Sequence, residues 1–382
     1  MKVICDRPAL LDAVNLVSGV VATRTPKPQL QCVKMMAAKG AGGVGSLTMV
    51  GTDQEVSIRL TTTQVDVQKP GEALIPADKL RQIVQAEDSE PTLTLETEGD
   101  VCHIRGGDAR FKVYGYPAAD FPPIPEFPAS KAAMTMTAGD LQDLISKTIF
   151  AAARETSRYA INGVLLRRDG KRLEMVATDG RRLALARSSL TSADGAAKEP
   201  QSCIIPTKAL NLGLKFIRDP EQAVRLSITP NQALFSFGDE GDATRCVLAT
   251  NLVEGAFPPY EDVIPKEQDK KATFDRDVLA SGVKRAALLT NEESRGVRLA
   301  LENDRLRLSS RAPEMGEAEI DVPMTGYEGE PIEIGFNPQF ITDALKVMSD
   351  QSVVVELKAP NKPGLIKSGA DFLYVVMPVN LQ

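Results

Sequence analysis

Two aspartates occupy equivalent places in a phrase that the chain states twice. Residues 49–60 read MVGTDQEVSIRL and residues 175–186 read MVATDGRRLALA, which aligns Asp53 with Asp179. Two carboxylates could in principle bind Mg²⁺ as a pair. However, each aspartate is followed by alternating, strand-like sequence, and an aspartate there commonly caps a turn by accepting hydrogen bonds from its own backbone. We therefore expect two turns rather than a metal site.

The segment Gly40–Gly45 (GAGGVG) and His103 are the other candidates for chemistry. The glycine segment matches the dinucleotide fingerprint letter by letter, but the fingerprint requires a strand before it and a helix after it. Strand-like sequence lies on both sides here, so a hairpin turn is expected. His103 is the only histidine, so no histidine-based triad or multi-histidine metal site can be built. The sequence predicts a non-catalytic protein without cofactor or metal; an enzyme acting on nucleotides is the weaker alternative.

Composition limits the class of protein further. The chain has 382 residues, enough for two or three domains, and a net charge of −6. Trp is absent and aromatic residues make up 5%, which disfavours a base-stacking groove for single strands. The cysteines are odd in number and form no C-x-x-C pair, which favours buried free thiols in a reducing cytoplasm. No signal peptide or apolar run long enough to cross a membrane occurs, so we expect a cytoplasmic protein without a membrane partner.

Three similar segments indicate an internal repeat. LIPADKLRQIV, IIPTKALNLGL and IGFNPQFITDAL place Leu80, Leu210 and Phe340 about 130 residues apart. Other phrases recur in the same order: a capped amphipathic helix, a short arginine-bearing loop, and strands that alternate in the manner of half-buried antiparallel pairs. Proline-rich connectors begin at Ala119 and Gly255.

The order of elements predicts the fold class. Helices and runs of strands do not alternate as βαβ units would, so the fold is α+β with three repeated domains, each of two helices packed on antiparallel sheets. The predicted domains are 1–129, 130–265 and 266–382. The predicted helices cover residues 6–20, 77–86, 138–154, 206–218, 276–289 and 338–348.

Charge is distributed unevenly between these elements. The six helix windows together are net positive although the whole chain is acidic. Such lysines could simply be solvated. Alternatively, the helices of all repeats present them to a phosphate backbone, in contacts that do not depend on base sequence. The residues concerned are Lys79, Arg81, Lys147, Arg154, Lys208, Lys215, Arg218, Lys284, Arg285 and Lys346.

Several ordered phrases along the whole chain resemble the bacterial beta sliding clamp family, the beta subunits of DNA polymerase III. They are RYAINGV from Arg158, VATDGRRLA from Val176, GAFPPYEDVIP from Gly255, SRGVRL from Ser294, IEIGFN from Ile332 and YVVMPVNL from Tyr374. The resemblance implies a processivity factor: two chains form a head-to-tail ring that encircles double-stranded DNA, with helices lining the hole and sheets running across the joints. Arg24 matches a loop position that touches the duplex in relatives.

The resemblance also implies a cleft between the middle and last domains that binds short peptides. The implied partners are the DNA polymerase III catalytic subunit, the clamp loader complex, repair polymerases, ligase and mismatch repair proteins. Leu, Val, Met and Pro side chains suit such a cleft, because they form an adaptable apolar surface, and Arg158 and Arg182 could hold polar groups of the peptide. A repeat scaffold that presents the cleft without binding DNA is the alternative. The implied cleft residues are Arg158, Ile161, Thr178, Gly180, Arg182, Leu183, Pro258, Val263, Asn337, Phe340, Pro363, Val375, Met377, Pro378, Val379 and Leu381.

Overall fold

The computed structural model describes residues 1–128, 134–155, 158–193, 201–238, 245–290, 296–302, 304–313 and 315–380. The chain forms two compact units. Unit 1 comprises residues 1–142, 190–196 and 208–252, and unit 2 comprises residues 143–189, 197–207 and 253–382. Residues of the predicted middle domain therefore contribute to both units.

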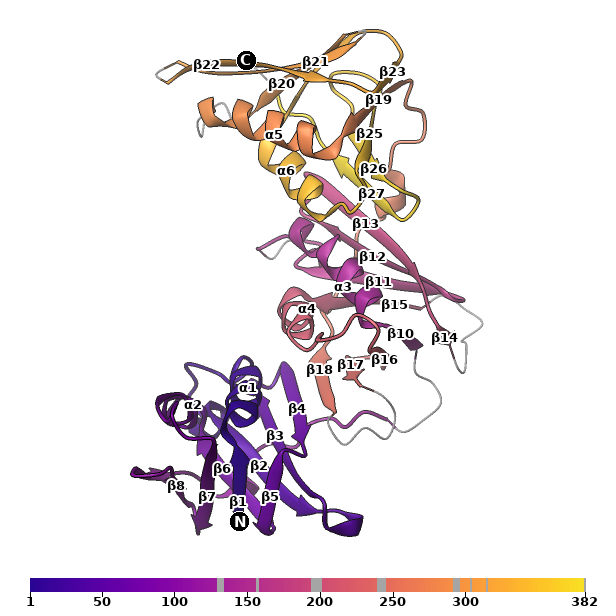
Figure 1. The fold of residues 1–382 in the computed structure, drawn as a ribbon. Coiled ribbons are helices and arrows are strands. Elements are labelled where there is room, and N and C mark those ends of the chain that lie inside the picture. The colour runs from indigo at the N-terminus through magenta and orange to yellow at the C-terminus, as the bar shows by residue number, and fades with distance from the viewer. Residues whose placement is uncertain are drawn as a thin grey trace. The chain divides into compact units, whose positions relative to one another are not determined.

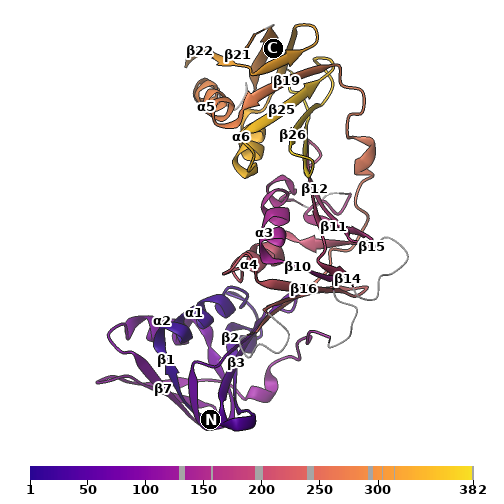
Figure 2. The same cartoon turned by 45° about the vertical axis from the view of Figure 1, so that its right-hand side comes forward.

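Six α-helices occur in the described residues, two from each predicted repeat. Helices α1 and α2 pack side by side (Figure 1), and α5 and α6 do the same (Figure 2). Capping explains where the first helix of each repeat begins, since side-chain oxygens of Asp6, Thr137 and Asp275 accept hydrogen bonds from backbone N–H groups of the first turn. The helices are α1 (Arg7–Ser18), α2 (Ala77–Ala86), α3 (Ala138–Ser146), α4 (Thr207–Leu214), α5 (Arg276–Ala286) and α6 (Pro338–Val347).

Every helix except α2 ends before the residue that the sequence predicts, and α3 and α4 fall short by the most. Helix α3 ends at Ser146 because the hydroxyl of Thr148 donates to the carbonyl of Leu144 while the chain tightens into a 3₁₀ turn at Ile149–Ala151. Helix α4 ends at Leu214, after which Lys215 and later residues make the shorter i→i−3 bonds that close a helix. The predicted extension of helix to residues 154 and 218 is wrong.

Unit 1 contains two antiparallel sheets. The first, sheet I, has the order β5-β1-β7-β8-β9 and the second, sheet II, has the order β14-β10-β16-β17-β18-β4-β3-β2-β6. Sheet I consists of β5 (Val65–Lys69), β1 (Lys2–Asp6), β7 (Thr92–Glu98), β8 (Val101–Arg105) and β9 (Arg110–Tyr114). Sheet II consists of β14 (Ser192–Ala193), β10 (Met134–Thr137), β16 (Ala223–Ile228), β17 (Gln232–Phe237), β18 (Cys246–Asn251), β4 (Val56–Thr62), β3 (Gly45–Thr52), β2 (Cys32–Lys39) and β6 (Gly71–Pro76).

Unit 2 also contains two antiparallel sheets. Sheet III has the order β15-β11-β12-β13-β27-β26-β25-β19-β23, and sheet IV has the order β22-β21-β20-β24. Sheet III consists of β15 (Gln201–Pro206), β11 (Gly163–Asp169), β12 (Arg172–Thr178), β13 (Arg182–Ser189), β27 (Phe372–Val376), β26 (Gly364–Ser368), β25 (Ser352–Leu357), β19 (Lys270–Asp275) and β23 (Gly326–Glu328). Sheet IV consists of β22 (Gly316–Pro323), β21 (Arg305–Ala312), β20 (Val297–Glu302) and β24 (Ile332–Phe336).

Sheets II and III each join strands from two sequence repeats. In sheet II, β18 of the middle repeat pairs with β4 of the first repeat. In sheet III, β27 of the last repeat pairs with β13 of the middle repeat. The middle repeat is therefore shared between the two compact units because each half of it belongs to a different continuous sheet. The boundary between the units consequently runs through the middle repeat rather than between neighbouring repeats.

Candidate partner-peptide cleft

A Thr-Asp turn precedes the strand that forms one wall of the candidate cleft. The hydroxyl of Thr178 donates to the carbonyl of Arg182 over 2.6 Å, and Asp179 Oδ1 accepts from the N–H groups of Arg181 and Arg182 over 2.9 and 3.0 Å. The same bonds occur in unit 1, where Asp53 Oδ1 accepts from two N–H groups over 2.9 and 2.8 Å. The turn prediction for both aspartates is confirmed.

The floor of the cleft is apolar and follows from strand alternation. Leu183 on β13 lies opposite Val375 on β27, which in turn lies opposite Leu365 on β26. Side chains on one face of neighbouring strands meet in this way because the side-chain period of a strand is two residues. Leu183 and Val375 are each only 3% exposed. They pack in one cluster with Tyr260 of the connector between the middle and last repeats.

Two of the predicted cleft residues expose large apolar side chains to solvent. Val263 of the connector is 52% exposed and Met377, which follows β27, is 43% exposed. Tyr159 is exposed as well, and the guanidinium of Arg158 lies 5.9 Å from the centre of its ring. Large exposed apolar side chains beside a buried apolar floor are typical of a surface that binds a peptide.

Arg182 is bound by neighbouring groups of the protein itself. Its Nη1 lies 2.8 Å from Asp343 on α6, its Nε lies 3.0 Å from Asp179, and its Nη2 donates to the carbonyl of Phe150 over 2.8 Å. The guanidinium also stacks 4.5 Å from the ring centre of Phe340. Three of its N–H donors are therefore used within the protein, and its side chain is 11% exposed.

The ionisation of this cluster agrees with its geometry. Burial acts to lower the pKa of Arg182, but the hydrogen bond to Asp343 and neighbouring charges leave its pKa raised. Burial also raises the pKa of the nearby Tyr374 hydroxyl. Both groups therefore keep one charge state over the physiological pH range, so the cluster is a fixed structural link between β13 and α6.

The chain after β27 is held by backbone hydrogen bonds to two other segments of unit 2. The N–H of Met377 donates to the carbonyl of Arg181 over 2.9 Å, and the N–H of Val379 donates to the carbonyl of Gly335 over 2.9 Å. Asn337, two residues after Gly335, caps α6 by accepting from the N–H of Gln339 over 2.9 Å. Leu381 lies outside the described residues.

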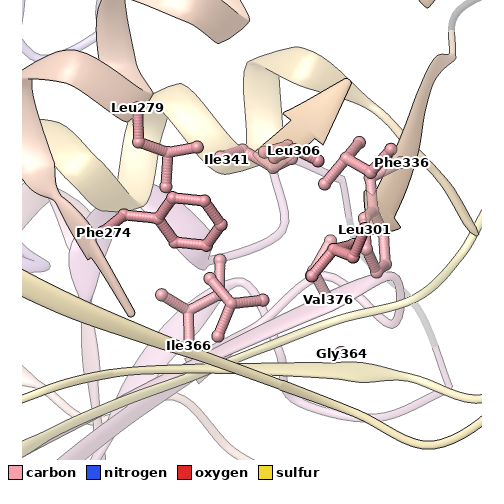
Figure 3. Close-up of a pocket in the computed structure, with 11 residues that line it drawn as sticks. Phe274, Leu279, Leu301, Leu306, Phe336, Ile341, Gly364, Ile366 and Val376 are labelled. Carbon is pink, nitrogen blue, oxygen red and sulfur yellow. The ribbon is translucent and has the colours of Figure 1, made fainter. Parts of the chain in front are cut away.

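A small cavity lies on the face of β27 opposite to that of Val375. Val376 points into it, with Phe274, Phe336 and Ile366 among its neighbours (Figure 3). Its volume is about 20 Å³ and its lining is wholly apolar. A space of this size and polarity is a packing gap in the core rather than a ligand site. Alternation along β27 therefore separates the cleft face, which carries Val375, from the core face.

All predicted cleft residues that the structure describes belong to unit 2. Ile161 is buried, whereas Pro258 and Pro363 are partly buried. The N–H of Ala153 donates to the carbonyl of Ile161, and the side-chain amide of Gln268 donates to the carbonyl of Pro363. Sequence patterns did not reveal Asp343 and Phe150 as partners of Arg182, because they lie 161 and 32 positions away. Tyr159 lies within the phrase RYAINGV, and its large aromatic side chain is the signal that could have identified it as a candidate site residue.

The eleven predicted DNA-facing residues are described, and their environments differ. Lys208 forms an ion pair with Asp53, Lys147 lies 2.9 Å from Asp143, and Lys79 lies 3.7 Å from Asp78. Arg81 and Lys147 are partly buried, and the other nine are exposed. Arg24 lies on the loop after α1, and Arg154, Lys215 and Arg218 follow the ends of α3 and α4 rather than lying on these helices.

The remaining candidates for chemistry are structural. Gly42 and Gly43 adopt a φ of +82° in the turn between β2 and β3, which confirms the hairpin prediction. His103 lies on β8, opposite Glu96 and Lys112. All five cysteines lie in the described part of the chain and are buried and unpaired. In the described residues there is no cluster of three or more potential metal ligands, and none of their helices is long and apolar enough to span a membrane.

Three helix-and-sheet repeats joined through continuous sheets define a clamp-type fold. Comparisons with known proteins agree with it along the whole chain. Models of the N-terminal, central and C-terminal domains of the DNA polymerase III beta subunit match residues 1–125, 135–259 and 261–380. The chain belongs to the DNA polymerase III beta subunit family, which comprises the beta sliding clamps.

Individual relatives are similar over their full length. The beta sliding clamp of Vibrio cholerae is 34% identical over 385 residues, covering 100% of both chains, and that of Escherichia coli K12 is 31% identical over 383 residues with the same coverage. A crystal structure of the DNA polymerase III beta subunit from Pseudomonas aeruginosa aligns with this chain with a TM-score of 0.87 and 32% sequence identity. A crystal structure of the DNA polymerase sliding clamp from Bacillus subtilis aligns with a TM-score of 0.91 and 25% identity. Each alignment covers 100% of both chains.

Proposed function

We propose that the protein is a non-catalytic processivity factor of DNA replication in the cytoplasm. Two copies form a ring around double-stranded DNA, and the ring tethers the DNA polymerase III catalytic subunit, the clamp loader and repair proteins through the partner-peptide cleft. A topological link of this kind raises the local concentration of the polymerase without requiring tight DNA contacts. The domains implied are 1–129, 130–265 and 266–382. Family membership and the continuous sheets together carry the proposal.

The strand pairing supports the dimer. Sheets II and III each join five strands of one repeat to four strands of the preceding repeat, through β18–β4 and β27–β13. Sheet I is the corresponding five-stranded half and sheet IV the four-stranded half, and within the described chain β9 and β22 are edge strands. Pairing β9 of one copy with β22 of another would complete a nine-stranded sheet of the same order, in a head-to-tail and therefore closable arrangement.

Charge on the two edges supports the same pairing. Strand β9 carries Arg110 and Lys112, whereas β22 carries Glu317, Glu319 and Asp321. Complementary edges favour the pairing of β9 with β22 and disfavour the pairing of either edge with its own copy. We expect a mass in solution of about twice the 41.2 kDa of one chain; a monomer at micromolar concentration would contradict the ring.

Encirclement of DNA is tested by comparing retention of the protein on circular and on linear DNA. The full-length protein is loaded by its clamp loader with ATP onto nicked circular duplex DNA, and the complex is separated by gel filtration. We expect the protein to remain with circular DNA and to be lost after a restriction enzyme linearises it, because a ring slides off a free end. Equal retention on both templates would refute encirclement and would leave the non-DNA scaffold as the better description.

The cleft is tested by a pair of methionine variants. Met377 and Met315 are both exposed, at 43% and 57%, but only Met377 lies at the cleft. We expect Met377→Lys to weaken binding of a fluorescein-labelled clamp-binding peptide of the polymerase at least tenfold in an anisotropy titration, because a charge at the rim disfavours burial of apolar groups. Met315→Lys is the matched control and should leave the affinity unchanged. Equal affinities for both variants would contradict the cleft.

A further inference from the structure

A second groove lies in unit 1, at the strand pair β4–β18. It has a volume of about 400 Å³ and is bordered by prolines of the connector that follows the first repeat. We name it the twin groove. Thr52, Glu55, Ser57, Ala249 and Asn251 are among the residues that line it.

The twin groove has the same backbone hydrogen bonds as the partner-peptide cleft. Each begins with a Thr-Asp turn whose bonds are duplicated between the units. Each ends with the residue after the cross-repeat strand pair donating back to the turn: Asn251 N–H to the Glu55 carbonyl over 2.9 Å, and Met377 N–H to the Arg181 carbonyl over 2.9 Å. Strands β18 and β27 thus occupy equivalent places beside equivalent turns.

The side chains at equivalent positions share their burial but not their chemistry. Strand register aligns Ser57 with Leu183, Ala249 with Val375, and Asn251 with Met377. In each set the first two residues are buried at the floor and the third is exposed at the rim. The floor of the twin groove therefore offers a hydroxyl and a methyl group where the cleft offers two large apolar side chains.

We propose that Ser57, Ala249 and Asn251, rather than the backbone of the twin groove, exclude the apolar partner peptide from it. The inference rests on the proposed function of the cleft. An apolar anchor binds in proportion to the apolar area that it buries, and the small polar floor of the twin groove removes that contribution. The three side chains are the specificity determinants that restrict the partner peptide to one site per chain.

The volume of the groove permits a direct test by transplantation. The variant Ser57→Leu/Ala249→Val/Asn251→Met gives the twin groove the side chains of the cleft, and a groove of about 400 Å³ has room for them. The labelled polymerase peptide is titrated into the full-length variant by calorimetry. We expect the stoichiometry to rise from one to two peptides per chain, with a dissociation constant of the second site within about tenfold of the first.

A reciprocal variant locates the new site. Adding Leu183→Ser/Val375→Ala/Met377→Asn to the transplanted chain should return the stoichiometry to one, with the peptide in the twin groove. If the triple variant melts below the wild type, Ser57→Leu/Asn251→Met replaces it, because it leaves the floor position of Ala249 unchanged. One peptide per folded transplanted chain overturns the inference but leaves the cleft intact, whereas no binding by the wild type refutes the cleft itself.

Discussion

Replacing Arg182 is the most informative test of how the cleft is built. The variant Arg182→Ala removes the guanidinium from Asp343, Asp179 and the carbonyl of Phe150. Loss of one partner of a buried ion pair costs about 3–5 kcal/mol because the other charge remains desolvated. The carboxylates here are 21% and 19% exposed, so water can hydrate them in part. We therefore expect a local destabilisation of about 2–3 kcal/mol.

Hydrogen exchange measured by mass spectrometry resolves this loss locally, since it reports the free energy of opening of individual segments. Amides of α6 and β27 should exchange faster in Arg182→Ala by roughly 30- to 150-fold, which corresponds to about 2–3 kcal/mol. In Arg182→Lys, the exchange rates of these amides should lie between those of the wild type and Arg182→Ala, because an ammonium keeps the charge but not the forked geometry of a guanidinium. The exposed neighbour Arg181 is the matched control, and Arg181→Ala should leave exchange in these segments unchanged.

A double-mutant cycle separates the ion pair from general damage. If Arg182 and Asp343 act as a pair, then Arg182→Ala and Asp343→Asn should be non-additive, with a coupling energy of about 1–2 kcal/mol. Additive effects, or exchange of α6 in Arg182→Ala equal to that of the Arg181→Ala control, would refute the role of Arg182 as a link between β13 and α6. Arg182 would then be available to a peptide, as the sequence alone predicts.

The sheet edges, the basic residues after α4 and the buried thiols are each open to a test of their own. Lys112→Glu on β9 should raise the dimer dissociation constant, measured by analytical ultracentrifugation, roughly tenfold, and adding Glu319→Lys on β22 should restore the original value. A dissociation constant of Lys112→Glu equal to that of the wild type would contradict the pairing of β9 with β22. Lys215→Ala/Arg218→Ala should reduce the slope of log K for DNA against log salt by about 2, while Lys171→Ala should not. Burial raises the pKa of Cys5 and Cys102 to about 12, so native protein should show no fast-reacting thiols with Ellman's reagent at pH 8 and five after unfolding. Thiols of the unfolded chain ionise at about pH 8.5, whereas the buried thiols of the folded chain keep their protons. The free energy of unfolding should therefore fall as the pH rises above that value.

Sequence patterns were sufficient for the local elements. The repeated phrases predicted hairpins such as β3–β4 and β12–β13, and capping residues predicted where α1, α3 and α5 begin. These features depend on residues a few positions apart, so the information lies within a short window. The ends of α3 and α4 were overestimated because the side-chain bond of Thr148 and the tightened turn after Leu214 compete with helix extension.

Similar local sequences can also lead to different sites, which limits what a sequence pattern predicts. Asp53 and Asp179 make the same turn, yet an ion pair with Lys208 accompanies the first and one with Arg182 accompanies the second. The apolar rim at Met377 and the polar rim at Asn251 differ although their backbones bond alike. Site chemistry at these joints is therefore set by individual side chains rather than by the repeat.

The sequence by itself determined the threefold repeat, the fold class, the turn role of the two aspartates and the family, because periodicity, capping and short phrases are local properties. Only the tertiary structure decided that β18 pairs with β4, that β27 pairs with β13 and that Arg182 forms an ion pair with Asp343. It also decided that the two units repeat one pattern of backbone hydrogen bonds beside these strand pairs. These features join residues more than a hundred positions apart. Their pairing depends on which sheet edges and buried charges meet in the folded chain.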